Sequence, residues 1–415
     1  DHALAPETSH KETTMTMTTV TTTAEEREAI IGAVREFAET ELAPYAAERD
    51  EKHLFPRESL NRAGELGLGG IYVDEEFGGS GLSRLDTVAI FEELAKGDPA
   101  VAAYISIHNM VVWMIDTYGD DAQRAHWLPM LTAMSEFGGY CLTEPGAGSD
   151  AANIATSAVR DGDDYVLTGV KQFISGAGEA AVYVVMARTG EPGARGISAF
   201  LVPGDSEALS FGAPEKKMGW HAQPTRQVIL DGVRVPASSM LGDEGRGFAI
   251  AMSALNGGRL NIAACSLGGA QWALDQAVKY VHERMAFGEP LAEKQSILFA
   301  IADMRTDLHA ARLMVRDGAQ AVDEKAPDAT MRCAMAKRFA TDAGFDVANR
   351  ALQLHGGYGY LQDYGIEKVV RDLRVHQILE GTNEIMRLIV GREMLRPAGS
   401  ASLQRNGGDQ MRSGS

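Results

Sequence analysis

A single carboxylate near the end of the chain, Glu380, has the surroundings of a general base. Ile378 and Leu379 precede it, Gly381 follows it so that the chain can turn sharply, and Thr382 can cap a helix that starts there. Apolar neighbours disfavour the ionised carboxylate and raise its pKa toward about 6 to 7, which suits a base working near neutrality. Glu380 is therefore the candidate catalytic residue. Taken alone, the same residues would also suit an acid on a surface loop.

A second segment, Tyr140–Asp150, could bind a ligand through its backbone. It reads Tyr-Cys-Leu-Thr-Glu-Pro-Gly-Ala-Gly-Ser-Asp, a strand-like start followed by small and hydroxyl residues. Such a loop leaves several backbone N–H groups free, and these groups can bind a phosphate or the edge of a flat polar ring. On its own, the segment is equally typical of a structural turn.

Five segments, in this order along the chain, resemble the sequence blocks of the acyl-CoA dehydrogenase family. They are Tyr140–Asp150, Lys171–Ser175, Arg284–Gly288, Gln353–Gly359 and Glu380–Glu384. The resemblance extends from about Ala24 to Leu395, and five ordered blocks are far more specific than any one of them. It implies the fold of that family, an FAD cofactor and an acyl-CoA substrate.

The resemblance also implies which residues hold FAD. Phe173 stands where many members have Trp, so its ring can cover the flavin but lacks the indole N–H donor. The other expected flavin-ring contacts are Leu142, Thr143 and Ser175. The pyrophosphate and adenosine are expected at Arg284, Phe287, Gln295, Gln353 and Gly357, and some of these would reach FAD in a neighbouring subunit, which implies an oligomer, expected to be a homotetramer. Thr382 and Glu384 resemble further FAD contacts at a helix start.

In this family a base removes a proton beside the thioester carbonyl while a hydride leaves the next carbon for the flavin, and the product is a 2,3-enoyl-CoA. The resemblance assigns the role of base to Glu380. Some relatives carry the base immediately before the arginine that corresponds to Arg259, but Gly258 occupies that position here and cannot serve. The substrate contacts implied by the resemblance are Ser149, Asn256, Arg259 and Gly381.

The segments Tyr104–Met110 and Gln377–Gly381 most resemble members that oxidise isobutyryl-CoA to methacrylyl-CoA in valine breakdown and pass electrons to electron-transferring flavoprotein. A short straight-chain or 2-methyl-branched acyl-CoA is the main alternative substrate, because one methylene in an apolar pocket changes selectivity only about 10- to 200-fold. Two less favoured alternatives are an acyl-CoA oxidase and a non-catalytic member of the family. An oxidase usually carries a further C-terminal helical domain, and a non-catalytic member would be expected to have lost the base.

Hydrophobic periodicity predicts an α+β protein in which helices, strands and helices follow in order to position these residues. A Thr-x-x-Glu capping box at Thr23 opens the first helix, and Asp161-Gly162 and Asp231-Gly232 are predicted hairpin turns between short β-favouring runs. We expect disordered tails over residues 1–22 and 398–415, an N-terminal helical domain over 23–137, an antiparallel β-barrel-like domain over 138–240, and an antiparallel four-helix bundle over 241–397.

Composition limits the partners and the compartment. The 415 residues are 45% hydrophobic and carry a net charge of -18, which argues against nucleic acid or an anionic membrane surface, since both require a cationic face. Cys141, Cys265 and Cys333 are too few and too widely spaced to predict disulfides or a zinc site, and we expect no metal. Without a recognisable leader or membrane span, we expect a bacterial cytoplasmic location, or the mitochondrial matrix if the source is eukaryotic.

Overall fold

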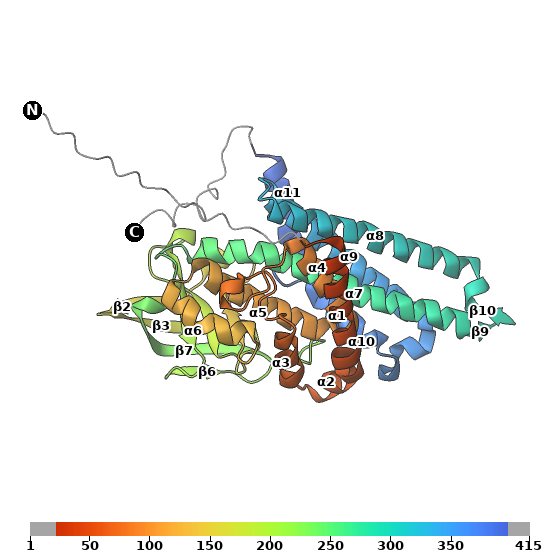
Figure 1. The fold of residues 1–415 in the computed structure, drawn as a ribbon, viewed down its shortest axis with the longest axis horizontal. Coiled ribbons are helices and arrows are strands. Elements are labelled where there is room, and N and C mark those ends of the chain that lie inside the picture. Colours follow the sequence, from red (N-terminus) through yellow and green to blue (C-terminus); the bar gives the residue numbers. More distant parts are fainter. Residues whose placement is uncertain (1–21, 397–415) are drawn as a thin grey trace, which may run out of the picture.

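The computed structural model describes residues 22–396, with helices at both ends of the chain and a sheet between them (Figure 1). The predicted capping box is present, because the side chains of Thr23 and Glu26 each accept a hydrogen bond from the other residue's backbone N–H. Thr22, the last residue of the predicted N-terminal tail, donates its hydroxyl to Asp86 Oδ2 at 2.6 Å. The rest of both predicted tails lies outside the described residues. The first helices are α1 (Ala24–Phe37), α2 (Ala46–Lys52), α3 (Arg57–Glu65), α4 (Arg84–Gly97), α5 (Pro99–Tyr118) and α6 (Asp121–Thr132).

The middle of the chain forms one eight-stranded sheet. Its order is β6-β7-β3-β2-β4-β5-β8, with β1 paired to β4, and no pairing within residues 22–396 joins β6 to β8. The strands are β1 (Gly138–Cys141), β2 (Ser157–Asp161), β3 (Asp164–Ser175), β4 (Val182–Arg188), β5 (Ile197–Pro203), β6 (Leu209–Phe211), β7 (Thr225–Pro236) and β8 (Met240–Leu241).

Most of the strand pairs are antiparallel, as predicted, but β1 and β2 both lie parallel to β4, so the sheet is mixed. Turn residues in a sequence indicate hairpins between consecutive strands, and these hairpins are antiparallel. Parallel pairs join strands that are distant in sequence, so turn residues do not predict them. The hairpin predicted at Asp161-Gly162 is confirmed, since Asp161 pairs with Asp164 across it. The turn predicted at Asp231-Gly232 is instead a bulge within β7, where the register against β3 shifts and Gly232 has φ +79°.

The C-terminal helices are long, as the sequence predicts. They are α7 (Gly247–Glu283), α8 (Gln295–Asp323), α9 (Ala329–His355), α10 (Ile366–Arg374) and α11 (Asn383–Met394), and a small hairpin of β9 (Met285–Ala286) and β10 (Glu289–Pro290) joins α7 to α8. With 37 residues, α7 is ~55 Å long and runs from the sheet to the far end of the molecule (Figure 1). α9 packs against α7, α8, α10 and α11. Among the helices between residues 22 and 396, none has both the length and the apolar character needed to cross a bilayer.

The two helical parts of the chain share one hydrophobic core. A single buried cluster contains Leu60 and Phe91 from the N-terminal helices together with Leu260, Met304 and Leu373 from the C-terminal helices. A second cluster joins α5, α6 and the start of α7 to one face of the sheet, and a third is formed by residues of the sheet region itself. The helical parts therefore pack as one body against the sheet, and the predicted domain limits stay a prediction.

A buried ionic cluster lies where three parts of the chain meet. Lys368 Nζ on α10 donates to Asp98 Oδ1 at 2.9 Å and to Asp372 Oδ2 at 2.7 Å, and both aspartates are fully buried. Asp98 caps α5, while Asp372 Oδ1 accepts from the backbone N–H of Trp220 at 2.6 Å. Burial alone would lower the pKa of Lys368, but Asp372 and Asp98 raise it above its usual value. The cluster thus ties the N-terminal helices, the sheet region and α10 together.

We predict that Lys368→Met destabilises the protein strongly, because it leaves two buried carboxylates without their cation. Breaking a buried ion pair in this way typically costs about 3–5 kcal/mol, so the melting temperature should fall by several degrees. Lys52→Met is the matched control. Lys52 and its partner Glu48 are half exposed on α2, so its loss should have little effect. Equal melting temperatures for the two variants would contradict this role of Lys368.

Candidate active site

Glu380 lies on a strained turn between α10 and α11. Its φ is +54°, unusual for a residue other than glycine, and the following Gly381 has φ +89°. Thr382 then caps α11, as predicted, by accepting from the backbone N–H of Ile385 at 3.4 Å. The two left-handed residues turn the Glu380 side chain toward α7. There a Cβ on Gly258 would lie 2.4 Å from Glu380 Oε2, so any larger residue at this position would displace the carboxyl group.

The Glu380 carboxyl group has the properties of a general base. Its Oε2 atom is buried and has no hydrogen-bond partner within residues 22–396. Burial raises the pKa of Glu380 from the ordinary 4.5 to about 7, against the opposing effects of Lys337 and Arg259. A carboxyl group with that pKa is substantially ionised at neutral pH and still basic enough to take a proton. The prediction of a raised pKa from apolar flanks therefore agrees in direction with the geometry.

Two buried cations hold the backbone of the turn. Arg259 Nε donates to the Glu380 carbonyl at 3.3 Å, and its Nη1 donates to Asn256 Oδ1 at 2.9 Å. Lys337 Nζ, from α9, donates to the Gly381 carbonyl at 2.9 Å. The structure therefore brings Asn256, Arg259 and Gly381 together around Glu380, as the sequence predicts.

Further polar groups surround this space without full partners. Tyr140 Oη, Arg84 Nη1 and both amide atoms of Asn261 are buried and lack hydrogen bonds within the described chain. The Arg84 guanidinium lies 3.4 Å from the centre of the Tyr72 ring. Burial raises the pKa of Tyr72, the charge of Arg84 opposes this shift, and the charge of Glu380 adds to it. Buried polar atoms without partners are rare in proteins and indicate a site that binds water or a ligand.

An exposed aromatic ring lies on the sheet beside the Tyr140–Asp150 loop. Phe173 has φ +60° and is 63% exposed, at the point where β3 shifts register against β7. The neighbouring loop is firmly held, since Lys171 Nζ donates to Leu142 O at 3.2 Å and to Glu144 Oε1 at 2.7 Å, and Gln172 N donates to Thr143 O at 2.8 Å. This arrangement offers a flat apolar surface on a rigid support.

The remaining expected flavin-ring residue, Ser175, is partly buried at the end of β3, where it pairs with Thr225. Leu142 is buried and Thr143 is partly buried at the start of the Tyr140–Asp150 loop. These positions, with Phe173, surround one end of β3.

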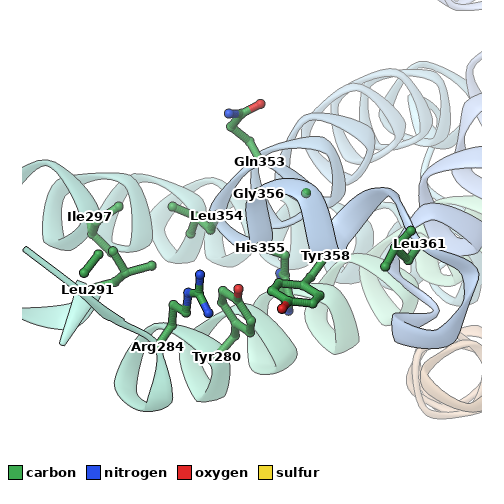
Figure 2. A pocket seen from close by; sticks show the side chains of 12 residues that line it. Tyr280, Arg284, Leu291, Ile297, Gln353, Leu354, His355, Gly356, Tyr358 and Leu361 are labelled. Atoms are coloured by element: carbon green, nitrogen blue, oxygen red, sulfur yellow. The ribbon is translucent and has the colours of Figure 1, made fainter.

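A second pocket lies at the far end of α7 (Figure 2). It has a volume of about 640 Å³, and Tyr280 and Arg284 point from the α7 side toward Tyr358, which follows α9. The Arg284 guanidinium is 5.5 Å from the centre of the Tyr358 ring. Gln353 and Gly357 also line this pocket, so three of the predicted pyrophosphate and adenosine contacts do meet.

This pocket is distant from Glu380 within one chain. Arg284 directly follows α7 and Gly258 lies near the start of that helix, so ~39 Å of helix separates them. Phe287, 96% exposed on the β9–β10 hairpin, and Gln295, exposed at the start of α8, belong to the same distant end. A single ligand that touches both Glu380 and Arg284 would therefore require Arg284 from another copy of the chain.

Three family models cover almost the whole described chain. They are the acyl-CoA dehydrogenase N-terminal domain over residues 24–135, its middle domain over 139–233 and its C-terminal domain over 245–395. The isobutyryl-CoA dehydrogenase, mitochondrial, of Bos taurus is 54% identical over 360 residues, which are 87% of this chain and 86% of that protein. The protein of the same name from Dictyostelium discoideum is 53% identical and is covered to 86%.

The chain belongs to the acyl-CoA dehydrogenase family.

Solved structures agree with this assignment. The butyryl-CoA dehydrogenase of Megasphaera elsdenii has a TM-score of 0.88 and 38% identity, and the match covers 91% of this chain and all of that one. A chain in a structure concerning the electron transferring flavoprotein of Acidaminococcus fermentans has a TM-score of 0.88 and 40% identity, with the same coverage. The chain is thus an acyl-CoA dehydrogenase in fold and in reaction class, and members of this family are flavoproteins.

The residues of this acyl-CoA dehydrogenase fit a flavin cofactor. The exposed Phe173 ring offers a surface for the flavin, and the pocket at Arg284 has the cation that a pyrophosphate requires. Ser149 and Glu384, by contrast, are exposed, and Glu384 lies 3.5 Å from Arg387 in an ion pair. Within residues 22–396 no group of three His, Cys, Asp or Glu side chains is arranged to hold a metal ion.

Sequence reasoning missed several residues of the acyl-CoA dehydrogenase site. Lys337, Arg84, Tyr72 and Asn261 lie outside the five matched blocks, and only the structure places them near Glu380. Lys337 carried little signal in the sequence, because Arg338 follows it directly, although Lys337, Ala334, Ala336 and Ala340 of α9 are all fully buried.

We predict that Glu380→Gln makes this dehydrogenase more stable at alkaline pH. The pKa of about 7 exceeds the ordinary 4.5, so the protonated carboxyl group contributes stability below pH 4.5, and this contribution is lost as the pH rises through 7. The loss amounts to about 3 kcal/mol, and glutamine does not incur it. The melting temperature of the variant should exceed that of the native protein at pH 8 and differ little at pH 5.

The matched control is Glu384→Gln, four residues further on and exposed, which should show no such dependence on pH. A Glu380→Gln variant whose melting temperature tracks the native one from pH 5 to pH 8 would mean that Glu380 titrates normally.

Proposed function

We propose that the protein is an FAD-dependent acyl-CoA dehydrogenase that converts isobutyryl-CoA to methacrylyl-CoA in valine breakdown, with Glu380 as the general base. The observation that carries the proposal is the Glu380 carboxyl group, whose Oε2 atom is buried without a hydrogen-bond partner and lies against Gly258 on a turn of two residues with positive φ. The high identity to two isobutyryl-CoA dehydrogenases supports the choice of substrate.

The chain's own groups can carry out the proton transfer. Glu380 Oε2 takes a proton from the carbon beside the thioester carbonyl, and its pKa near 7 allows it to do so at neutral pH. Backbone N–H groups of the Glu380 turn can donate to the carbonyl oxygen, where negative charge develops. Oε2 itself is buried, and exclusion of water from that atom strengthens these interactions.

FAD, when bound, accepts the hydride from the neighbouring carbon. We assign the flavin ring to Leu142, Thr143, Phe173 and Ser175, where the Phe173 ring can cover it. Pyrophosphate and adenosine are assigned to Arg284, Phe287, Gln295, Gln353 and Gly357 of a neighbouring subunit, with Thr382 and Glu384 as further contacts. The ~39 Å of α7 between Gly258 and Arg284 supports sharing between subunits, and we propose a homotetramer.

The substrate is assigned to Glu380, Asn256, Arg259 and Gly381, with Ser149 as a contact for the CoA part. Leu379, the residue before the base, is partly buried and packs against the main helical core. Its resemblance to members that oxidise isobutyryl-CoA supports a small branched acyl group. A short straight-chain or 2-methyl-branched acyl-CoA is the alternative, and the rat short-chain specific acyl-CoA dehydrogenase is 41% identical.

We propose electron-transferring flavoprotein as the electron acceptor. The matching chain in the Acidaminococcus fermentans structure, which concerns such a flavoprotein, supports this choice. The two isobutyryl-CoA dehydrogenases are described as mitochondrial, which supports the mitochondrial matrix if this protein is eukaryotic, and the bacterial cytoplasm stays the alternative.

We predict that Glu380→Gln abolishes turnover while FAD stays bound. Glutamine keeps the size of the side chain but removes the basic oxygen, and loss of a positioned general base typically lowers the rate about 10²- to 10⁴-fold. The measurement is the rate of anaerobic flavin bleaching by isobutyryl-CoA, with flavin content determined on the same sample.

Glu384→Gln is the control, and any loss of its activity should follow its flavin content. A Glu380→Gln variant with full FAD and a rate within tenfold of the native one would place the base elsewhere.

We predict that isobutyryl-CoA is the best substrate in a panel of C4 to C8 acyl-CoA thioesters. Discrimination by an apolar pocket should be modest, about 10- to 200-fold per methylene, so kcat/KM must be compared rather than activity at one concentration. A higher kcat/KM for butyryl-CoA or 2-methylbutyryl-CoA would overturn the substrate assignment and leave the family assignment intact.

A further inference from the structure

Lys337 is a buried cation directly behind the candidate base. It lies in the middle of α9, is fully buried and is surrounded there by alanines. Its Nζ donates to the Gly381 carbonyl at 2.9 Å and to Asn383 Oδ1 at 3.0 Å. Lysine is almost never fully buried unless it is paired, because burying an ammonium group is costly. Here both hydrogen-bond partners are uncharged, so the charge of Lys337 is not neutralised by an ion pair.

The hydrogen bonds of Lys337 stabilise the turn that carries the base. Two successive left-handed residues, one of them Glu380, are unfavourable unless their surroundings fix them. The Glu380 carbonyl is held by Arg259 from α7, and the Gly381 carbonyl is held by Lys337 from α9. Each of the two strained peptides is thus fixed by a cation from a different helix.

The charge of Lys337 also acts on the Glu380 carboxyl group. Burial raises the pKa of that group, and Lys337 is the stronger of the two cations that lower it, ahead of Arg259. Burial lowers the pKa of Lys337 itself to about 8, although Glu380 opposes this shift. Lys337 is therefore still largely protonated at pH 7, where Glu380 must lose its proton.

The other titratable groups that face Glu380 do not change charge near pH 7. Burial raises the pKa of Tyr140 on β1, of Tyr72 and of Cys265 on α7, so all three stay neutral. Cys333, which faces Arg259 and Arg84, has its pKa raised to about 12 by burial. Burial lowers the pKa of Arg259, and the charges of Asp342 and Glu384 act on Lys337. Burial and the charge of Lys337 lower the pKa of His376 to about 3, so His376 stays neutral near pH 7. Substitution of Lys337 therefore tests directly how a neighbouring positive charge affects the ionisation of Glu380.

We propose that Lys337 is a positioning residue for the dehydrogenase reaction, holding the Glu380–Gly381 turn through its hydrogen bonds and supplying the positive charge that keeps the Glu380 carboxyl group ionised near neutral pH. This inference rests on the proposed role of Glu380 as the base. A purely structural lysine, which only joined α9 to α11 through Asn383, would affect stability without affecting the ionisation of Glu380.

The experiment compares Lys337→Met with Lys337→Arg, which keeps the charge. Thr341→Val is the structural control, because Thr341 hydrogen-bonds to Asn383 in the same place but carries no charge. The first readout is the infrared absorbance of the protonated Glu380 carboxyl group as a function of pH, assigned by difference from the same protein carrying Glu380→Gln. The second is the pH profile of kcat/KM for flavin bleaching by isobutyryl-CoA, at equal flavin content.

For Lys337→Met we expect the midpoint of Glu380 ionisation to rise by about one pH unit or more. The rate at pH 7 then falls about fivefold or more, and part of it returns at pH 9. Lys337→Arg should keep a midpoint near the native value, and Thr341→Val should lower the melting temperature without moving the midpoint. If Lys337→Met fails to fold, Lys337→Gln takes its place, since its amide N–H can still donate while the charge is gone.

A folded, flavin-loaded Lys337→Met or Lys337→Gln protein with the native midpoint in both readouts would overturn the proposal. A midpoint shift of equal size in Thr341→Val would overturn it as well, because the shift would then follow packing rather than charge. If Glu380→Gln in the otherwise native protein leaves both the carboxyl band and the activity unchanged, the proposed function would be overturned instead.

Discussion

The contact between the Glu380 carboxyl group and the backbone of α7 at Gly258 constrains the rest of this fold. A Cβ at that position would lie 2.4 Å from Glu380 Oε2, so the carboxyl group lies directly against the backbone of α7. α7 and α9 pack against each other, and both contribute fully buried alanines, such as Ala263 and Ala336, to one core. Small side chains along these helices let the cations of Arg259 and Lys337 reach the same turn from two sides.

The sequence was informative where local residues determine local structure. The capping box at Thr23, the hairpin at Asp161 and the cap of α11 at Thr382 are all present, because each depends on residues a few positions apart. The parallel pairing of β1 and β2 with β4 could not be predicted, since it depends on which distant strands meet. The Asp231-Gly232 pair forms a bulge for the same reason, because its long partner strand β3 continues past it.

In the candidate site, too, the sequence identifies residues in short local blocks but not residues that only packing brings in. Glu380, Arg259 and Asn256 could be identified from short blocks of sequence, and the structure brings them together. Lys337 and Arg84 could not, because they reach the site only through the packing of α9 and α4 around α7. Arg284, Gln353 and Gly357 do form a common pocket, but the length of α7 separates it from Glu380 of the same chain. A sequence shows which residues are available, whereas the length of α7 sets how far apart they lie within one chain.

The contact at Gly258 also has a consequence for how this family can vary. Some relatives carry their base on the helix, at the position before the arginine, and the carboxyl group of Glu380 occupies the space directly beside that position here. An acidic side chain at position 258 and one at position 380 would compete for the same volume and repel each other. The reactive carboxylate can thus reach one point in space from either of two elements, but not from both at once. Moving the base from one element to the other therefore requires two coordinated changes, and each single change alone gives a protein with either a clash or no base.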